Sequence, residues 1–226
     1  MTVFRYALKR MLRSRATLLL LALPFGLLLL PAQRGWEPLL PAWHYYGLLL
    51  LLLAARLPAL LLVERTSGVL LRVASSPISH LRYLAEHMLA YGALLGLQIG
   101  AFVGAGMLRY RDPVQPWPLL AVYAAFALAA LALVLAWCSL FRNRETSALI
   151  LFSLCMLAMM LGGLLWPVQA LPAALQRTAW LIPTYWLGEG YRTVAAGDHS
   201  ALLAAIGMLL LFAAAGLLLG SRRRLN

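Results

Sequence analysis

Residues 118–140 read PLLAVYAAFALAALALVLAWCSL, a run without a single Lys, Arg, Asp or Glu. About 20 apolar residues in a helix are enough to cross the hydrocarbon core of a bilayer, so this run predicts a transmembrane helix. Across all 226 residues, 63% are hydrophobic and 12% are charged, whereas an ordinary soluble domain has about 25% charged residues. The mean hydropathy is +0.84. These values exclude a soluble enzyme and predict an all-α integral membrane protein.

Five other apolar runs are long enough, or nearly so, to cross a bilayer. Together with residues 118–140 they give six predicted spans, at residues 16–31, 44–63, 83–108, 118–140, 147–166 and 201–220. The N-terminal span is the shortest, and Pro24 and Gly26 predict a kink in it. The alternative for the first 33 residues is a cleaved signal peptide, because a basic leader precedes an apolar core. We favour six spans, since the pattern of small residues at a cleavage site is poor.

The basic residues indicate the orientation, because Lys and Arg concentrate in cytoplasmic loops. If the N-terminus is inside, 13 of the 19 Lys and Arg fall in inner segments, five fall outside and Arg56 lies within a span. Both termini are therefore predicted to be cytoplasmic. We interpret the net charge of +12 as this topology signal and do not expect nucleic acid as a partner. Tryptophans typical of a membrane interface fall at the predicted outer face: Trp36, Trp43, Trp117, Trp166, Trp180 and Trp186.

Residues 1–15 carry a pattern of their own. Apolar side chains recur at helical spacing, and Arg5, Lys9, Arg10 and Arg13 stand between them. This pattern is typical of a basic amphipathic helix that lies on the inner leaflet and contacts membrane lipids. The alternative is a basic flank of the first span.

The segment after the second span, residues 64–80, is the most informative part of the sequence. Residues 64–79 read ERTSGVLLRVASSPIS. Glu64 and Arg65 mark the exit from the bilayer, Gly68 permits a sharp change of direction, and Pro77 forces a turn before the third span. Residues 69–74 can form a short helix parallel to the membrane. The segment is thus suited to transmitting force, although a plain inner loop is the alternative.

Motifs for chemistry are missing from the chain. It has no phosphate-binding Gly-rich loop ending in Lys-Ser/Thr, no His-Glu-x-x-His pair and no nucleophile elbow. Cys138 and Cys155 lie in apolar runs without metal-ligand spacing, so we expect them to be packing residues and expect no metal site. We predict that the chain is not an enzyme, binds no cofactor and depends on another polypeptide for any use of ATP.

Two groups of residues resemble the ABC transporter type-2 permease family, the membrane subunits of ABC exporters. The first group consists of Glu64, Arg65, Gly68, Arg72, Ser76, Pro77 and Ile78. The second precedes the sixth span and consists of Gly162, Gly163, Pro167, Leu171, Pro172, Leu175, Gln176, Pro183, Thr184, Tyr185, Glu189 and Arg192. Leu70 and Leu71 replace an acidic residue that is common in the family, and Ile182 stands where an Asn is usual.

The resemblance implies a bacterial inner-membrane exporter with two six-span protomers, each docked to one ATP-binding subunit that holds ATP and magnesium. The second protomer is either another copy or a related permease. A coupling helix would contact the ATPase through Glu64, Arg65, Gly68, Arg72, Ser76, Pro77, Ile78 and Ser79. Residues 167–192 would form re-entrant half-helices over the outer end of the pathway; the alternative there is a surface girdle of aromatic residues.

Further candidates for the pathway lie within the spans. A charge in the bilayer is costly, so Arg56 needs a partner or must reach the interface. Glu86 and His87 are the expected partners, and Glu145 is the next candidate. Arg56 and its partner would form either a polar element of the pathway or a structural ion pair. Glycines at every fourth position from 92 to 104 predict close helix packing within the protomer or sliding against a moving helix. Met156, Met159 and Met160 share a face that suits an apolar binding wall or ordinary packing. The complete set of pathway or gate candidates is Arg56, Glu86, Met156, Met159, Met160, Gly163, Pro167, Pro183, Tyr185 and Glu189.

The scarcity of charge in the spans favours an amphipathic or hydrophobic substrate such as a drug, an antibiotic, a hydrophobic peptide or a lipid-like molecule. Export of a lipid-linked polysaccharide or another specific metabolite is the alternative. An integral-membrane lipid enzyme would need the inner cluster of His80, Glu86 and His87. A passive channel or scaffold would not need the motif around Gly68 and Pro77.

Overall fold

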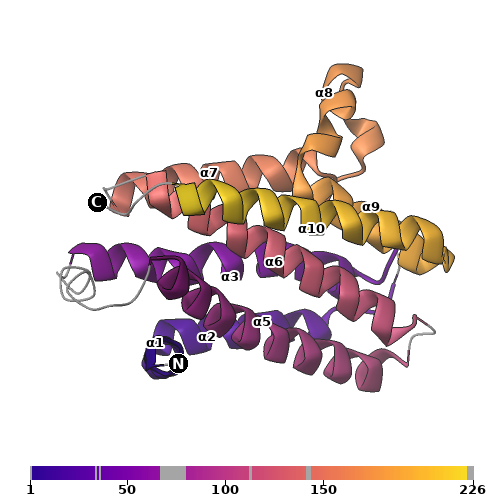
Figure 1. The fold of residues 1–226 in the computed structure, drawn as a ribbon. Helices are drawn as coiled ribbons and strands as arrows, with labels where there is room; N and C mark the ends of the chain where they lie inside the picture. The colour runs from indigo at the N-terminus through magenta and orange to yellow at the C-terminus, as the bar shows by residue number, and fades with distance from the viewer. Residues whose placement is uncertain are drawn as a thin grey trace.

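The computed structural model describes residues 2–33, 35, 37–66, 80–111, 114–140 and 144–222, and this part of the chain is helical throughout, without a strand (Figure 1). The α-helices are joined by three short 3₁₀ helices, named η. In chain order the elements are α1 (Thr2–Arg13), α2 (Arg15–Ala22), η1 (Leu23–Leu29), α3 (Pro41–Thr66), α5 (His80–Tyr110), α6 (Pro116–Leu140), α7 (Arg144–Leu161), η2 (Val168–Ala170), α8 (Ala173–Thr178), η3 (Ala179–Leu181), α9 (Pro183–Ala196) and α10 (His199–Arg222).

The long helices lie side by side as a bundle, and their direction alternates along the chain (Figure 1). Helix α1, the end of α3, the start of α5 and the end of α10 lie toward one end of the bundle, on the left of the view. The start of α3, the end of α9 and the start of α10 lie toward the other end. We call these the α1 end and the α9 end of the bundle.

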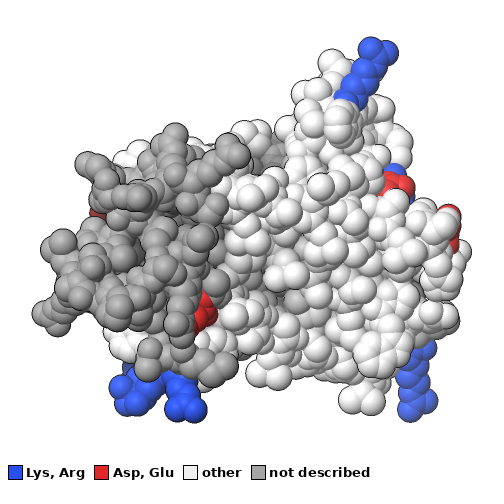
Figure 2. Space-filling view, in the orientation of Figure 1, with Lys and Arg blue, Asp and Glu red and all other residues white. Residues whose placement is uncertain are grey.

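The lengths and compositions of several helices suit a membrane. Within the described residues, segments Glu86–Tyr110, Pro116–Cys138 and His199–Gly220 are long and apolar enough to cross a bilayer. Segments Phe4–Arg13 and Thr17–Leu29 pass the same test as a bent pair. Figure 2 shows that the middle of the visible face is uncharged, whereas blue Lys and Arg atoms project near its ends. An apolar belt between charged ends is the pattern expected of a membrane protein.

Helix α6 lies at the centre of the bundle, packed against α3, α5, α9 and α10. Its most extensive contact is with α10. A Cβ atom added at Gly216 of α10 would lie 2.7 Å from the carbonyl carbon of Ala132, and one at Gly220 would lie 3.5 Å from Cα of Ala136. The backbones of the two helices therefore touch, as small residues at a spacing of four allow in membrane helices.

The predicted kink in the first apolar run is a change of helix type. The α-helical turns of α2 give way to η1, with Pro24 in its first turn. A 3₁₀ helix rises about 2.0 Å per residue against about 1.5 Å in an α-helix, so α2 and η1 together extend about 26 Å. The hydroxyl of Tyr110 on α5 lies 3.0–3.3 Å from the carbonyl oxygens of Leu27, Leu28 and Leu30, and donates to this end of the segment.

The fifth predicted span, residues 147–166, extends five residues beyond the end of the corresponding helix, α7. Helix α7 stops at Leu161, because Gly163 has a φ of +79°, a left-handed conformation that terminates a helix. Helices α3, α5 and α10 extend beyond the predicted spans by two or three residues at each end.

One expectation about packing is wrong. A Cβ atom added at Gly92, Gly96, Gly100 or Gly104 would meet nothing within 4 Å, so this stripe does not pack against the described part of the protomer. Trp43 lies at the start of α3 and is completely buried, with its ring against Gly106 of α5. Periodicity identifies a face of small residues, but it does not say which neighbour, if any, covers that face.

The contact between α6 and α10 gives a first prediction. Gly216→Ala places a methyl group against the backbone at Ala132 and Leu133, which cannot move aside as a side chain can. We expect the free energy of unfolding to fall by about 1–3 kcal/mol, the usual cost of overpacking. Thermal unfolding in detergent measures this change, with a thiol-reactive dye reporting the exposure of the buried Cys138 and Cys155.

Gly207→Ala on the same helix is the matched control, because an added Cβ atom there meets nothing within 4 Å. We expect this variant to be as stable as the wild type or slightly more stable, since Ala is the better helix former. Equal stability of the Gly216→Ala and wild-type proteins would contradict the close packing of α6 on α10.

Candidate functional site

The proposed coupling residues fall mostly outside the described part of the chain. Glu64 and Arg65 belong to the last turn of α3, and α5 begins at His80. Gly68, Arg72, Ser76, Pro77, Ile78 and Ser79 lie outside the described residues. The structure therefore gives the place of this segment in the chain, between the ends of α3 and α5 that lie at the α1 end of the bundle (Figure 1).

The chain leaves the bundle after α7 and returns at α9. The excursion covers residues 162–182, and α8 projects from the bundle in Figure 1. Pro167 and Pro172 precede η2 and α8, where their fixed φ suits the entry to a helix. The side-chain nitrogen of Gln176 donates to the carbonyl of Leu171 at 2.7 Å and stabilises the turn. Residues 173–178 are exposed, as expected of an element that stands apart from the core.

The two ends of the excursion meet at Gly162 and Thr184. The Thr184 hydroxyl donates to the carbonyl of Ala158 in the last turn of α7. A Cβ atom at Gly162 would overlap the Thr184 side chain, so glycine is needed for this approach. The start of α9 is thus fixed beside the end of α7, and the excursion closes on itself.

Helix α9 is the part of this segment that enters the bundle. Pro183 occupies its first turn, and Gly197 ends it in the left-handed conformation with φ +70°. One face of α9 is buried against α6 and α10, through Leu187, Gly190 and Tyr191. A Cβ atom at Gly190 would lie 2.8 Å from Val122 of α6, so α9 and α6 are also in close contact.

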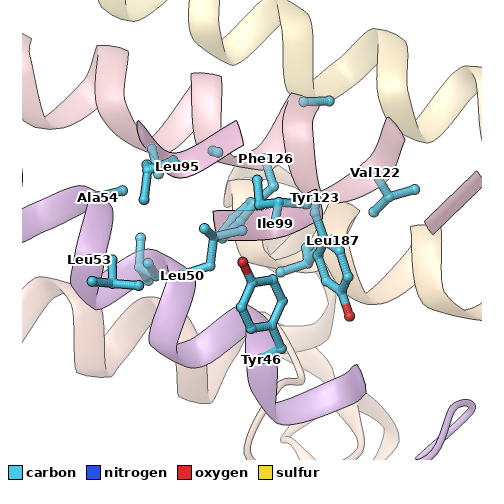
Figure 3. Close-up of a cluster of buried hydrophobic side chains, with 14 of the residues drawn as sticks. Tyr46, Leu50, Leu53, Ala54, Leu95, Ile99, Val122, Tyr123, Phe126 and Leu187 are labelled. Atoms are coloured by element: carbon cyan, nitrogen blue, oxygen red, sulfur yellow. The ribbon is translucent and has the colours of Figure 1, made fainter. Parts of the chain in front are cut away.

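The buried face of α9 completes a cluster of aromatic and polar side chains, which we call the aromatic cluster. Figure 3 shows Tyr46 of α3 lying beside Tyr123 of α6 and Leu187 of α9. The rings of Tyr46 and Phe102 are stacked at 4.0 Å, and those of Tyr46 and Tyr123 meet edge to face at 4.7 Å. The members, which come from α3, α5, α6 and α9, are Trp43, His44, Tyr46, Gln98, Phe102, Tyr123 and Tyr191.

Hydrogen bonds within the aromatic cluster join the same helices. The Tyr46 hydroxyl donates to Oε1 of Gln98 at 2.7 Å, and the Tyr123 hydroxyl donates to the carbonyl of Trp43 at 2.6 Å. Nε2 of His44 lies 3.0 Å from the carbonyl oxygen of Leu164, just after α7. Polar groups of this kind are costly to bury unless they are paired, so these bonds fix the mutual register of α3, α5, α6 and the segment after α7.

Two features of the aromatic cluster bear on movement. The Tyr191 hydroxyl lies directly against Gly47, where a Cβ atom would overlap it, so α9 is seated against the backbone of α3. The Gln98 amide is 6% exposed, and its Nε2 has no hydrogen-bond partner among the described residues. A buried donor without a partner costs free energy, so Gln98 is a point at which this packing is not fully satisfied.

Sequence reasoning missed this cluster because it searched for charges. His44 and Gln98 were available as signals, since a polar residue within an apolar run is a default candidate for function in a membrane protein. The tyrosines gave no such signal, because Tyr is also common at membrane interfaces.

The predicted partners of Arg56 are engaged elsewhere. Arg56 is exposed on α3 and, within the described part, forms no ion pair with Glu86, His87 or Glu145. The carboxylate of Glu86 accepts the backbone N–H of Phe4 in α1 at 3.2 Å. His87 is buried beside Tyr91, and Glu145 lies in the first turn of α7, where a helix dipole favours an acidic residue.

The remaining candidates are placed as follows. Met159 is buried in the core and Met156 packs against it, so these side chains contribute to packing here. Met160 and Tyr185 are half-buried, and Glu189 forms an ion pair of 2.9 Å with Arg192 on the same helix. The Trp186 indole nitrogen donates to the carbonyl of Trp180 at 2.7 Å and links α9 to η3.

Two acidic side chains at the α9 end have low pKa values for different reasons. Burial raises the pKa of Glu37, but hydrogen bonds from the Tyr45 hydroxyl at 2.6 Å and from the backbone N–H of Gly35 outweigh it and lower the pKa. The pKa of Asp198 is lowered by the backbone N–H of Ala201 and by the Ser200 hydroxyl, both at the start of α10. Both carboxylates are therefore ionised at neutral pH.

Comparison with known families assigns most of the chain. A family model described as ABC-2 family transporter protein matches residues 39–222. The match begins before α3 and ends with α10, so it contains the aromatic cluster and the excursion and leaves out α1, α2 and η1. A search of curated proteins finds no match for the chain.

The seat of α9 on α3 gives the second prediction. Gly47→Ala places a methyl group on the Tyr191 hydroxyl and 2.6 Å from a methyl carbon of Leu187. We expect the free energy of unfolding to fall by about 1–3 kcal/mol. Adding Tyr191→Phe removes the overlapping oxygen, so the double variant should recover part of the lost stability. Thermal unfolding measures this recovery.

Gly96→Ala on α5 is the control, because that position is exposed and open. Strictly additive effects of Gly47→Ala and Tyr191→Phe would contradict a direct contact, since residues in contact show a coupling energy in such a cycle.

Proposed function

Because the chain belongs to the ABC-2 transporter family, it is a permease subunit of an ABC transporter, and we propose that it exports an amphipathic or hydrophobic substrate. The substrate class comprises drugs, antibiotics, hydrophobic peptides and lipid-like molecules. We further propose that two permease protomers, either two copies or this chain with a related permease, work with two ATP-binding subunits in a bacterial inner membrane. In this arrangement both termini and residues 64–80 face the cytoplasm, and the α9 end faces outward.

The observation that carries the proposal is the connection made by residues 67–79. They join the end of α3 to the start of α5. At about 1.5 Å per residue, these helices extend about 39 Å and 46 Å, longer than the roughly 30 Å core of a bilayer. An ATP-binding subunit that contacts the connection would therefore act on two rigid rods that extend toward the aromatic cluster.

The aromatic cluster supports a second step, from α3 and α5 to α9. Tyr46 and Gln98 connect the two rods to each other, and Gly47 receives the Tyr191 hydroxyl of α9. A tilt of α3 would move Gly47 relative to α6. Helix α9 would then have to move with α3 or lose the contact between Tyr191 and Gly47. Packed elements have discrete arrangements, which is how a small displacement at one end becomes a defined change at the other.

The order of events follows from these contacts. Closure of the ATP-binding subunits pushes on residues 64–80, and α3 and α5 change their tilt around the central α6. The Tyr46–Gln98 bond keeps the two helices together while α9 and the excursion move at the α9 end. The substrate would then leave outward when α8 and α9 move away from the outer end of the pathway.

The surface supports an apolar cargo. The white area in the middle of Figure 2 is uncharged, and the exposed side chains of α7 and α10 include Leu149, Phe152, Leu203 and Leu211. Arg56 is the exception, because it is exposed in the middle of α3. An exposed base at this depth is costly against lipid, so we propose that Arg56 faces the pathway between protomers.

The coupling step gives the third prediction. Arg72→Glu reverses a charge in the proposed contact with the ATP-binding subunit. We propose that Arg72 faces an acidic residue of that subunit, so that the variant brings like charges together; recovery of the subunit with the tagged permease from its native membrane should then fall about tenfold, a cost of about 1.4 kcal/mol. Arg177→Glu on the exposed α8 is the matched control and should leave recovery unchanged.

Equal recovery of the ATP-binding subunit with the two variants would show that Arg72 does not contribute to the contact. Absence of any ATP-binding subunit from the wild-type preparation would sink the exporter proposal as a whole.

Arg56 gives the fourth prediction. Because its side chain is exposed, Arg56→Leu should change the free energy of unfolding by less than about 0.5 kcal/mol. Substrate export and substrate-stimulated ATP hydrolysis of the reconstituted complex should fall about tenfold, and Arg56→Lys should be intermediate. A large loss of thermal stability with normal transport per folded complex would show that Arg56 is a structural brace.

A further inference from the structure

Helix α1 lies outside the family match and carries a cationic surface. Arg5, Lys9 and Arg13 are exposed on α1, and Arg15 is exposed at the start of α2. Residues 2–13 contain no Asp or Glu. The opposite face is buried, with Ala7 and Met11 at 3% and 1% exposure. The helix therefore turns one face to the bundle and presents an unbalanced positive charge on the other.

The direction of α1 suits a membrane surface. The axes of segments Phe4–Arg13 and Thr17–Leu29 differ by 84°. If the second segment crosses the bilayer, the first must lie nearly in its plane. Tyr6 and Leu12 are 56% and 48% exposed, side chains that suit the depth of lipid headgroups.

Contacts with α5 hold α1 in this position. Helix α1 packs along α5, and the backbone N–H of Phe4 donates to the Glu86 carboxylate at 3.2 Å. The first N–H groups of a helix lack partners within the helix, and the positive end of its dipole favours an anion. Glu86 is thus a positioning residue for α1, on the helix that follows the coupling segment.

We propose that the exposed face of α1 docks on anionic phospholipids, with the phosphate groups of the leaflet at the α1 end bound by Arg5, Lys9, Arg13 and Arg15. Charge complementarity favours this occupant over a neutral lipid, because juxtamembrane Lys and Arg are attracted to the negative surface of the cytoplasmic leaflet. Arg side chains bind the phosphate oxygens in a forked geometry, and the net negative charge of an anionic headgroup adds an attraction that a zwitterionic headgroup lacks. This docking does not require the ATP-binding subunit, so it is separate from the exporter proposal.

The test measures lipid selectivity of the full chain reconstituted alone. Electron paramagnetic resonance separates spin-labelled phosphatidylglycerol and phosphatidylcholine that are immobilised by the protein from those in free bilayer. We expect phosphatidylglycerol to be preferred by at least about threefold at low salt, and the preference to be largely lost at 0.5 M sodium chloride because the charges are exposed. The combined variant Arg5→Gln, Lys9→Gln, Arg13→Gln should also lose it.

The matched control neutralises as many exposed cations elsewhere: Arg109→Gln, Arg111→Gln, Arg177→Gln. It should keep the preference of the wild type. The accessibility of Cys138 and Cys155 to a thiol dye verifies that both variants are folded. If the combined variant does not fold, the single variants Arg5→Gln and Lys9→Gln decide the question, because each should lower the preference in part and the control variants should not.

Either of two results would overturn the proposal. One is a preference for phosphatidylglycerol that is equal in the α1 variant and in the control, or that is insensitive to salt. The other is an unchanged preference together with loss of the co-purifying ATP-binding subunit, which would assign the face of α1 to that protein instead.

Discussion

The close approach of α6 to its neighbours is the constraint on which the rest of the structure depends. Lipid tails are as apolar as Leu, so helices in a membrane gain little from hiding apolar surface and are held by close packing and buried hydrogen bonds. Gly216 and Gly220 bring α10 onto the backbone of α6, and Gly190 brings α9 onto Val122. Because these contacts join backbone to backbone or to a short side chain, α6 cannot separate from α10 or α9 without losing them. A change of tilt in α3 and α5, which lack such contacts with α6 among the described glycines, disturbs this packing least.

The surrounding elements combine long rods with short, interrupted segments. Helices α3 and α5 are continuous over 26 and 31 residues, whereas the chain from Gly162 to Ile182 consists of turns, two 3₁₀ helices and α8. Backbone that does not form a regular helix is tolerated at membrane depth only where protein or water covers it. The aromatic cluster lies where the rods meet α9, and its polar groups join them through a few specific bonds. The long helices, which can transmit a movement as rigid bodies, thus lie next to short elements that can change their conformation.

The sequence predicted the helices well and their contacts poorly, for a physical reason. Apolar runs and the residues that flank them are local, so the places of α3, α5, α6 and α10 and the helix starts after Pro167 and Pro172 and at Pro183 follow from short stretches, whereas α7 already ends at Leu161 before Gly163. Contacts are not local. The glycine stripe of α5 is open, while Gly216 and Gly220, which have the same spacing of four, and the isolated Gly47 carry the close approaches. Glu86 was expected beside Arg56 but caps α1, because a helix terminus competes for the same carboxylate.

We propose that ATP binding moves α9 relative to α5 through the aromatic cluster. The distance between spin labels at Ala196 and Leu108, which are both exposed, reports this movement and is measured by double electron–electron resonance in the complex with its ATP-binding subunit. We expect the distance distribution to shift when ATP and vanadate trap the closed ATPase, and Tyr46→Phe to weaken the shift without abolishing ATP hydrolysis. A distribution that stays the same while the complex hydrolyses ATP and transports substrate would contradict a movement of α9.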